Sequence, residues 1–418
     1  MGQIMAASAA NPRTSMQSLR LDLPPSCVEF CPADPAYFLV GTYNLEKSES
    51  LAPEDGEADG PKLESQVQTQ SRNGSLIVFQ LVNKAIIHLQ TEQQSSAVLD
   101  LHFNPNPGWQ NISAVVSSTA TLSLFELSPL QDKPLKALST ANMAILTRGE
   151  YNPPPGTELL FLSCCWHPTR ADTITISTSA GNVHLVNLGR DGRDWTLHPN
   201  PVLTHSLEAW CVAISPYLDP SQQPDNQAFT IFSGGDDSVL HYRTCSIVPA
   251  SETTSLEYRL DGYTSTIKRD HNAGVTAILP LGLQEGVSEL VITGSYDDHI
   301  RLFAVASAAA ACTPRPAKLL AESDLAGGVW RLKLIDLKHS PADGVFYRLR
   351  ILASCMHAGV RVVELVKTTD GDWEFLTVGS FEEHKSMNYG TDYQTDHDGK
   401  LCVISTSFYD KLLCLWEL

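Results

Sequence analysis

Several side chains in the second half of the sequence have the chemistry of a hydrolytic or cation-binding site. His357 suits general-base catalysis because imidazole titrates near neutral pH, and Asp392 could orient that ring or activate water itself. Cys355 and Ser407 are candidate nucleophiles, but both stand in expected strands and should be buried. Aromatic faces beside carboxylates can bind an organic cation. The residues with that chemistry are Glu208, Trp210, Asp236, Trp330 and Tyr389.

Familiar enzyme motifs are absent from the sequence. There is no G-x-S-x-G nucleophile elbow, no phosphate-binding G-x-x-x-x-G-K-[ST], no dinucleotide fingerprint and no H-E-x-x-H. No motif for binding the methyl donor S-adenosylmethionine is present either. The 10 cysteines contain no C-x-x-C pair, so we expect neither a metal site nor a cofactor. From the residues alone, the default function is therefore a non-catalytic interaction platform.

Composition narrows the classes of partner. Lys and Arg total 29 against 47 Asp and Glu, which gives the 418 residues a net charge of −18. This acidity disfavours direct binding of nucleic acid and of anionic lipid. The N-terminus lacks a secretory pattern, and the longest weakly apolar run, residues 304–312, is too short to cross a membrane. We therefore expect a cytoplasmic protein with reduced cysteines, working as a monomer.

A repeated strand pattern must supply the elements that position these residues. Seven short runs alternate apolar and polar residues and most follow a second short strand and a tight turn, as DDHIRLF ending at Phe303 and DKLLCLW ending at Trp416 do. The stretch ELVITGSYDDHIRLF shows the plan best, with strand 289–295, turn 296–298 and strand 299–303. Such periodic self-similarity is typical of repeat architectures.

These runs resemble WD repeats from about residue 20 onward. The resemblance rests on turn aspartates, on histidines upstream of them and on a terminal tryptophan, namely Asp237, Asp297, Asp410, His205, His271, His384 and Trp416. In that family such residues form a hydrogen-bonded set that braces one blade, and the fifth repeat fits best, with His271, Thr293 and Asp297 and with Phe303 in place of Trp. His357 replaces the turn Asp in the sixth repeat, so it is free for another role.

The resemblance implies an all-β fold, a seven-bladed WD-repeat β-propeller. We expect residues 16–418 to form one propeller, in which an N-terminal strand within 16–23 completes the seventh blade and closes the ring. Residues 1–15 are expected to be disordered. The polar, acidic stretch at about 46–72 is expected to be a disordered insertion within the first blade.

Several segments narrow the resemblance further. They are residues 205–210, 233–237, 294–300, 327–331, 355–359, 388–392 and 407–410. Together they resemble the WD-repeat diphthine methyl ester esterase family of the diphthamide pathway, whose members are called methylated-diphthine methylhydrolase or diphthine methyltransferase. Most of these segments belong to loops entering the innermost strands and to the turns, which share one face of a WD propeller. They are therefore expected to meet at a central mouth.

The resemblance implies hydrolysis of the methyl ester of methylated diphthine on translation elongation factor 2. That substrate carries a trimethylammonium group, for which Trp210, Trp330 and Tyr389 with Glu208 and Asp236 would form the binding site. Ester hydrolysis by His357 or Asp392 could use water or an acyl-enzyme, and the residues do not decide between them. The alternative function is a non-catalytic scaffold. An enzyme predicts a recessed mouth, and a scaffold predicts a flatter rim.

Overall fold

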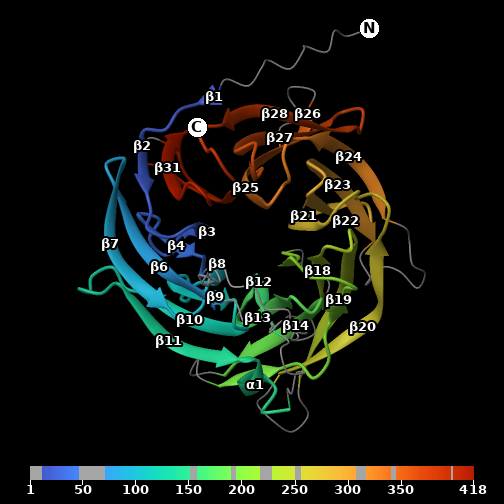
Figure 1. The fold of residues 1–418 in the computed structure, drawn as a ribbon. Coiled ribbons are helices and arrows are strands. Elements are labelled where there is room, and N and C mark those ends of the chain that lie inside the picture. The colour runs from blue at the N-terminus through green and yellow to red at the C-terminus, as the bar shows by residue number, and fades with distance from the viewer. Residues whose placement is uncertain are drawn as a thin grey trace, which may run out of the picture.

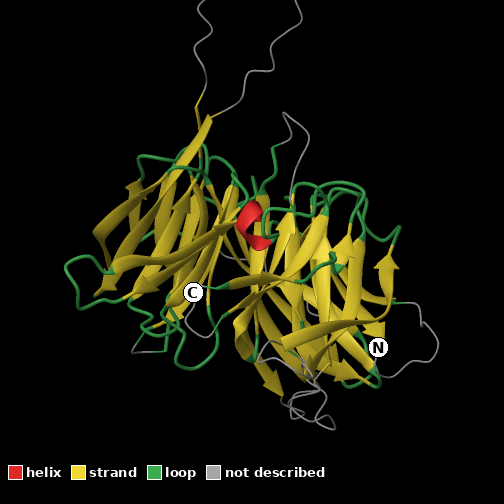
Figure 2. Ribbon diagram, turned by 90° about the horizontal axis from the view of Figure 1, so that it is seen from below, coloured by secondary structure: helices red, strands yellow, loops and turns green. Residues whose placement is uncertain are grey.

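Seven antiparallel sheets form the blades of a β-propeller around a central axis (Figure 1). The computed structural model describes residues 12–46, 71–150, 158–189, 194–216, 228–249, 256–306, 317–339, 345–396 and 399–418. The loops lie at the ends of the strands, and the only helix in the described ranges is the single turn α1 (Met143–Leu146) (Figure 2). The sequence-based expectation of an all-β, seven-bladed propeller is confirmed.

The strands follow the chain blade by blade, with the innermost strand first. Blade one contains β3 (Pro25–Phe30), β4 (Tyr37–Thr42), β5 (Asn44–Glu46), β6 (Ser71–Val82) and β7 (Ala85–Gln94). Blade two contains β8 (Val98–Phe103), β9 (Ile112–Ser117), β10 (Thr121–Leu127) and β11 (Leu135–Asn142). Blade three contains β12 (Phe161–His167), β13 (Arg170–Thr178), β14 (Asn182–Leu188), β15 (Trp195–Leu197) and β16 (Leu203–Thr204).

The remaining blades repeat this plan. Blade four contains β17 (Cys211–Ile214), β18 (Ala228–Gly234), β19 (Leu240–Pro249) and β20 (Leu256–Ile267). Blade five contains β21 (Val275–Glu285), β22 (Ser288–Ser295), β23 (His299–Ala306) and β24 (Lys318–Asp324). Blade six contains β25 (Arg331–His339), β26 (Val345–Ser354), β27 (Val360–Thr368) and β28 (Trp373–Phe381). Blade seven contains β29 (Asn388–Thr395), β30 (Leu401–Ser407) and β31 (Leu412–Glu417).

The two ends of the described chain meet in blade seven. Strand β2 (Gln17–Arg20) pairs antiparallel with β31, from Gln17 opposite Leu415 to Arg20 opposite Leu412, so the expected closure of the ring by an N-terminal strand is confirmed. Just before it, β1 (Pro12–Arg13) pairs in parallel with β28 of blade six. Of the segments expected to be disordered, residues 1–11 and 47–70 lie outside the described residues.

Side chains between neighbouring blades form the core. The alternating runs predicted half-buried strands, but middle strands such as β9 are buried on both faces because another blade packs against each side. The interface of blades six and seven shows this packing, with the rings of Phe381 and Trp416 stacked 5.1 Å apart. None of the helices within the described ranges has the length and apolar character that crossing a bilayer would require.

Candidate functional site

Four aromatic side chains gather where the innermost strands begin. Trp210 precedes β17, Trp330 precedes β25, Tyr389 is the second residue of β29, and Tyr296 lies on the turn between β22 and β23. Ring centroids are 5.7 Å apart for Trp210 and Trp330, 4.9 Å for Trp330 and Tyr389, and 5.8 Å for Tyr296 and Trp330. We call these four residues the aromatic mouth. All are half-buried, so their faces are only partly covered by protein.

Backbone geometry brings these residues to one face. In each antiparallel blade the start of the innermost strand lies beside the end of the next, as the hydrogen bond from Trp330 N to Ser354 O shows. Two glycines make room for neighbouring side chains. A Cβ atom at Gly274 would lie 3.1 Å from the Tyr296 ring and 2.9 Å from Asp236 Oδ1, and one at Gly328 would lie 2.7 Å from Met356 Sδ.

A carboxylate is held at the edge of the aromatic mouth. Asp236 Oδ1 accepts a hydrogen bond of 2.5 Å from Trp210 Nε1, and the Asp236 backbone N–H donates to Glu208 O. Burial and the nearby Asp236 charge raise the pKa of Tyr296, so its phenol stays neutral at physiological pH. A neutral aromatic surface with one anchored carboxylate is suited to a cationic ligand. The structure thus brings together Trp210, Asp236, Trp330 and Tyr389, as the sequence predicted.

The structure does not bring the two predicted catalytic residues together. His357 is exposed on the turn between β26 and β27, and no described residue hydrogen-bonds to its ring. Asp392 is buried on β29, where Oδ2 accepts from Phe30 N at 2.7 Å and Oδ1 accepts from Tyr393 N and binds Lys333. Asp392 therefore does not orient His357 in this arrangement. Their catalytic roles stay predictions.

Six charged side chains from four innermost strands meet below the aromatic mouth. They are Glu29 on β3, Asp100 and His102 on β8, Arg331 and Lys333 on β25, and Asp392 on β29, and we call them the channel network. Opposite charges alternate through it. Arg331 Nη2 lies 2.7 Å from Asp100 Oδ1, His102 Nδ1 lies 3.0 Å from Glu29 Oε2, and Lys333 contacts both Glu29 and Asp392.

The channel network keeps its imidazole charged. Although burial disfavours a charged ring, the carboxylates of Asp100 and Glu29 raise the pKa of His102 to about 10. Against the effect of its own burial, Arg331 and His102 hold the pKa of Asp100 well below its usual range. Burial raises the pKa of Asp392, and Lys333 opposes that shift. The network therefore contains a protonated imidazole, which cannot serve as a general base.

One cavity connects the channel network with the aromatic mouth. It has a volume of about 410 Å³, and its lining includes Trp210, Trp330, Arg331, His102 and Glu29. Its other walls are largely apolar side chains of blades three to five, such as Val212 and Ile278. A recess of this size is typical of small-molecule sites.

The candidate nucleophiles are poorly placed for attack. Cys355 is fully buried, and burial raises the pKa of its thiol to about 12, so almost no thiolate forms near neutral pH. Ser407 is also buried, and its Oγ pairs with Ser386 Oγ at 2.9 Å. These positions favour water over either side chain as the attacking group.

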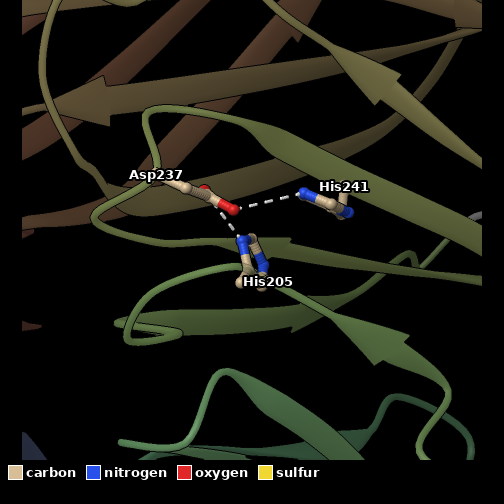
Figure 3. Close-up of side chains that lie close together, drawn as sticks. All are labelled: His205, Asp237 and His241. Carbon is tan, nitrogen blue, oxygen red and sulfur yellow. Dashed lines mark hydrogen bonds and ion pairs between the residues drawn. The ribbon is translucent and has the colours of Figure 1, made fainter.

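The histidines predicted to brace blades are buried inside them. In blade four His205 Nδ1 lies 3.0 Å from Asp237 Oδ1 (Figure 3). On the other side of the ring, His205 Nε2 lies 3.0 Å from Ser233 Oγ. His241 approaches the same carboxylate, with Nε2 3.6 Å from Asp237 Oδ2. Against burial, the hydrogen bonds from these histidines hold the pKa of Asp237 well below its usual range. The three side chains could surround a metal ion, but each already has a partner within the group.

Blades five and seven vary this brace. His271 Nε2 pairs with Thr293 Oγ1 at 2.9 Å, whereas Asp297 pairs with Arg301 rather than with the histidine. His384 Nε2 pairs with Ser405 Oγ at 2.8 Å, and the same hydroxyl accepts from Trp416 Nε1. The brace expected from the sequence is therefore present, although its carboxylate is engaged differently in each blade.

Comparison with known proteins was made at the level of sequence. No family model matches the chain. It is 25% identical over 95% of its length to a diphthine methyltransferase homolog of Dictyostelium discoideum, covering 97% of that protein. It is 25% identical over 93% of its length to diphthine methyltransferase of Mus musculus, covering 71%, and 24% identical over 96% to the Saccharomyces cerevisiae protein of that name, covering 97%. The resemblance found in the sequence is thus confirmed, and this propeller is similar along nearly its whole length to proteins named diphthine methyltransferase.

Proposed function

We propose that this protein acts in diphthamide biosynthesis by hydrolysing the methyl ester of methylated diphthine on translation elongation factor 2. The relatives' names indicate an enzyme that acts on diphthine. The hydrolytic direction is our inference, because the sequence has no recognisable methyl-donor motif. We expect the product to be diphthine and methanol.

The observation that carries this proposal is the aromatic mouth with its anchored carboxylate. Trp210 and Trp330 line the central cavity, and Asp236 is hydrogen-bonded to Trp210 beside them. A quaternary ammonium has no N–H to donate, so it is recognised by aromatic faces and by a nearby negative charge, at about 0.5–2 kcal/mol per contact. Methylated diphthine presents such a group next to its ester.

We propose that water is the attacking group. The oxygen of water bonds to the ester carbonyl carbon, a base takes its proton, and the methoxide leaves as methanol. His357 is the better placed of the two predicted bases, because its ring is exposed whereas both oxygens of Asp392 already have partners. His357 also lies on the same face as the aromatic mouth. It follows Ser354 by three residues, and the carbonyl oxygen of Ser354 accepts a hydrogen bond from the backbone N–H of Trp330.

The deciding experiment follows the mass of the modified histidine. Purified protein is incubated with elongation factor 2 carrying methylated diphthine, and the modified peptide is measured by mass spectrometry. Loss of one methylene unit supports hydrolysis. Gain of a methyl group on unmethylated diphthine would instead support methyl transfer, and stable binding without a mass change would support a scaffold.

Variants then test the roles of individual residues. His357→Ala should reduce turnover by roughly 10²–10⁴-fold if it is the base, while Trp210→Ala should mainly raise KM. The control is Tyr263→Ala, which removes a highly exposed aromatic ring away from the site. Normal turnover by a folded His357→Ala protein would remove His357 from the mechanism.

A further inference from the structure

The channel network presents Arg331 and His102 to the cavity and buries the carboxylates of Asp100 and Asp392. The side chains of Arg331 and His102 are 27% and 34% exposed, whereas that of Asp100 is 0% exposed. Lys333, next along the same strand face, is 38% exposed against 1% for Asp392. Although the six charges balance, the surface that a ligand would meet is therefore cationic. This is notable in a protein with a net charge of −18.

Arg331 lies beside His102 and has donors to spare. Its Nη1 is 3.5 Å from His102 Nε2, which is itself 3.4 Å from Asp100 Oδ1. A guanidinium has five N–H donors, and among the described residues only Asp100, through Nη2, and His102, through Nη1, approach them. The remaining donors belong to a side chain that lines the cavity. An anion beside Arg331 would accept these hydrogen bonds.

Glu29 also lines the cavity but does not cancel this effect. Its Oε2 already accepts from His102 Nδ1 at 3.0 Å and from the backbone N–H of Phe103 at 3.1 Å. The carboxylate of Glu29 thus holds the imidazole in its charged form and in one orientation, in the way that an outer partner fixes a ligand-binding histidine.

The side of the same cavity that is formed by the aromatic mouth favours a positively charged ligand. Trp330 and Arg331 are consecutive residues and both line it, so the aromatic mouth and the cationic pair are neighbours. We propose that the central cavity binds betaines, with a quaternary ammonium against the aromatic mouth and a carboxyl group on the adjacent carbon against Arg331 and His102. This deepens the proposed function, on which it rests, by assigning the carboxyl end of the substrate.

The arrangement has a consequence for ester hydrolysis. When water adds to the ester, the carbonyl electron pair moves onto oxygen, and collapse of that oxyanion expels methoxide, which takes up a proton. Negative charge therefore grows at the carbonyl oxygen, where Arg331 stands as a preorganised donor beside the charged ring of His102. The same cations bind the charged carboxylate more tightly than the neutral methyl ester, so the product is the better ligand.

Small ligands test the site on the unmodified protein. Isothermal titration calorimetry would compare 2-(trimethylammonio)butyrate, its methyl ester, tetramethylammonium and butyrate. We expect the zwitterion to bind at least about 10-fold more tightly than the ester and than either single-charge ion. Equal affinity of the zwitterion and tetramethylammonium would overturn the proposal, since the carboxylate would then contribute nothing.

Paired substitutions locate the anion. Arg331→Gln combined with Asp100→Asn replaces both members of the closest ion pair by neutral side chains of similar size, so neither Arg331 nor Asp100 is left as an unpaired charge, and Glu29 remains as the carboxylate partner of His102. This variant should lose about 10-fold or more in affinity for the zwitterion and none for tetramethylammonium. The matched control is Arg348→Gln with Glu364→Gln, an ion pair on β26 and β27 that does not line the cavity. If the first variant does not fold, His102→Gln gives the same readout.

The two proposals fail in different ways. If the zwitterion binds but the ester on the elongation factor is not cleaved, the betaine site is supported and the hydrolytic function is contradicted. If the ester is cleaved at the same rate by the Arg331→Gln, Asp100→Asn protein, the function stands and the anion site falls. A zwitterion affinity unchanged in the variant would likewise contradict the site.

Discussion

The histidines of the blade braces and the histidine of the channel network have opposite electrostatics. His271 and His384 pair with hydroxyl groups inside single blades, and burial lowers the pKa of each to about 4. His102 lies between two carboxylates that raise its pKa to about 10. The same side chain is therefore neutral at His271 and His384 and charged at His102, which borders the cavity. Burial alone does not distinguish a histidine at a functional site from one that only braces the fold. The charges around the ring make that distinction.

The two regions also differ in what they connect. A brace joins strands of one blade, as His271 and Thr293 do in blade five. The channel network joins blades one, two, six and seven, through contacts such as Arg331 to Asp100. We therefore expect a broken brace to loosen one blade and a broken network contact to affect the whole ring.

The largest expected effect is in the channel network. Arg331→Met leaves Asp100 as a buried carboxylate without its strongest partner, so it should lower the free energy of unfolding by about 3–5 kcal/mol. Urea denaturation followed by tryptophan fluorescence would measure the change. The control, Arg348→Met, removes a pair whose arginine is 42% exposed and should change stability by less than about 1 kcal/mol. Similar losses in both variants would contradict the distinction.

A blade brace should contribute less to the free energy of unfolding than the channel network does. Thr293→Val removes the hydroxyl that pairs with His271 and leaves a buried imidazole nitrogen unsatisfied, which should reduce stability by about 1–3 kcal/mol. Thr395→Val, on the exposed end of β29, makes the same change of side chain and should have little effect. A Thr293→Val loss as large as that of Arg331→Met would show that the braces are equal partners in holding the ring.

The two kinds of histidine should respond to pH with opposite signs. His102 has a folded pKa near 10, above its unfolded value of about 6.5, so its contribution is complete below pH 6.5 and is lost as pH rises toward 10. His271 and His384 have folded pKa values near 4, so their contribution is complete above pH 6.5 and is lost as pH falls toward 4.

The free energy of unfolding, measured from pH 4 to pH 10, would test these two opposite dependences on pH. One group changes the free energy of unfolding by at most about 1.4 kcal/mol per pH unit. His102→Gln should flatten the alkaline limb only, and His271→Gln should flatten the acid limb only. An alkaline limb unchanged by His102→Gln would mean that His102 is not protonated in the folded protein.

The smallest effect is expected within blade four. His241 has the same place relative to Asp237 that Arg301 has relative to Asp297 in blade five. His241→Arg should therefore change stability by less than about 1 kcal/mol, since both side chains can pair with the carboxylate of Asp237. A large loss, or a loss that appears only when zinc is present, would show that His241 has a task beyond the brace. Thermal unfolding with and without zinc would separate these outcomes.

The propeller and the aromatic mouth could be predicted from the sequence because their signals lie within short segments of the chain. A run such as DDHIRLF contains its own strand period and turn, and repetition makes the pattern unmistakable. The residues of the mouth follow from that register, because Trp210 and Trp330 directly precede innermost strands. Closure by β2 was predictable because blade seven otherwise lacks an outer strand.

The channel network was missed because it is entirely non-local. Its members are spread from Glu29 to Asp392 and meet only once the ring closes. A signal was nevertheless present: Asp100 with His102, and Arg331 with Lys333, are charged residues two apart on innermost strands, so each pair shares a strand face. The sequence favours His357 because it departs from the repeat, whereas its exposed position depends on packing. The sequence places Tyr296 only within a turn.

The closure of blade seven also sets the order in which the protein can be completed during synthesis. Strand β2 leaves the ribosome long before its partner β31, which ends at Glu417, almost 400 residues later. Until then a nascent chain carries an unpaired strand edge and an unfinished blade, both prone to wrong association. Early blades can form as they emerge, but the cavity they surround exists only after the last strand arrives. Chains truncated even slightly before that point should therefore be sent to degradation rather than retained with partial activity.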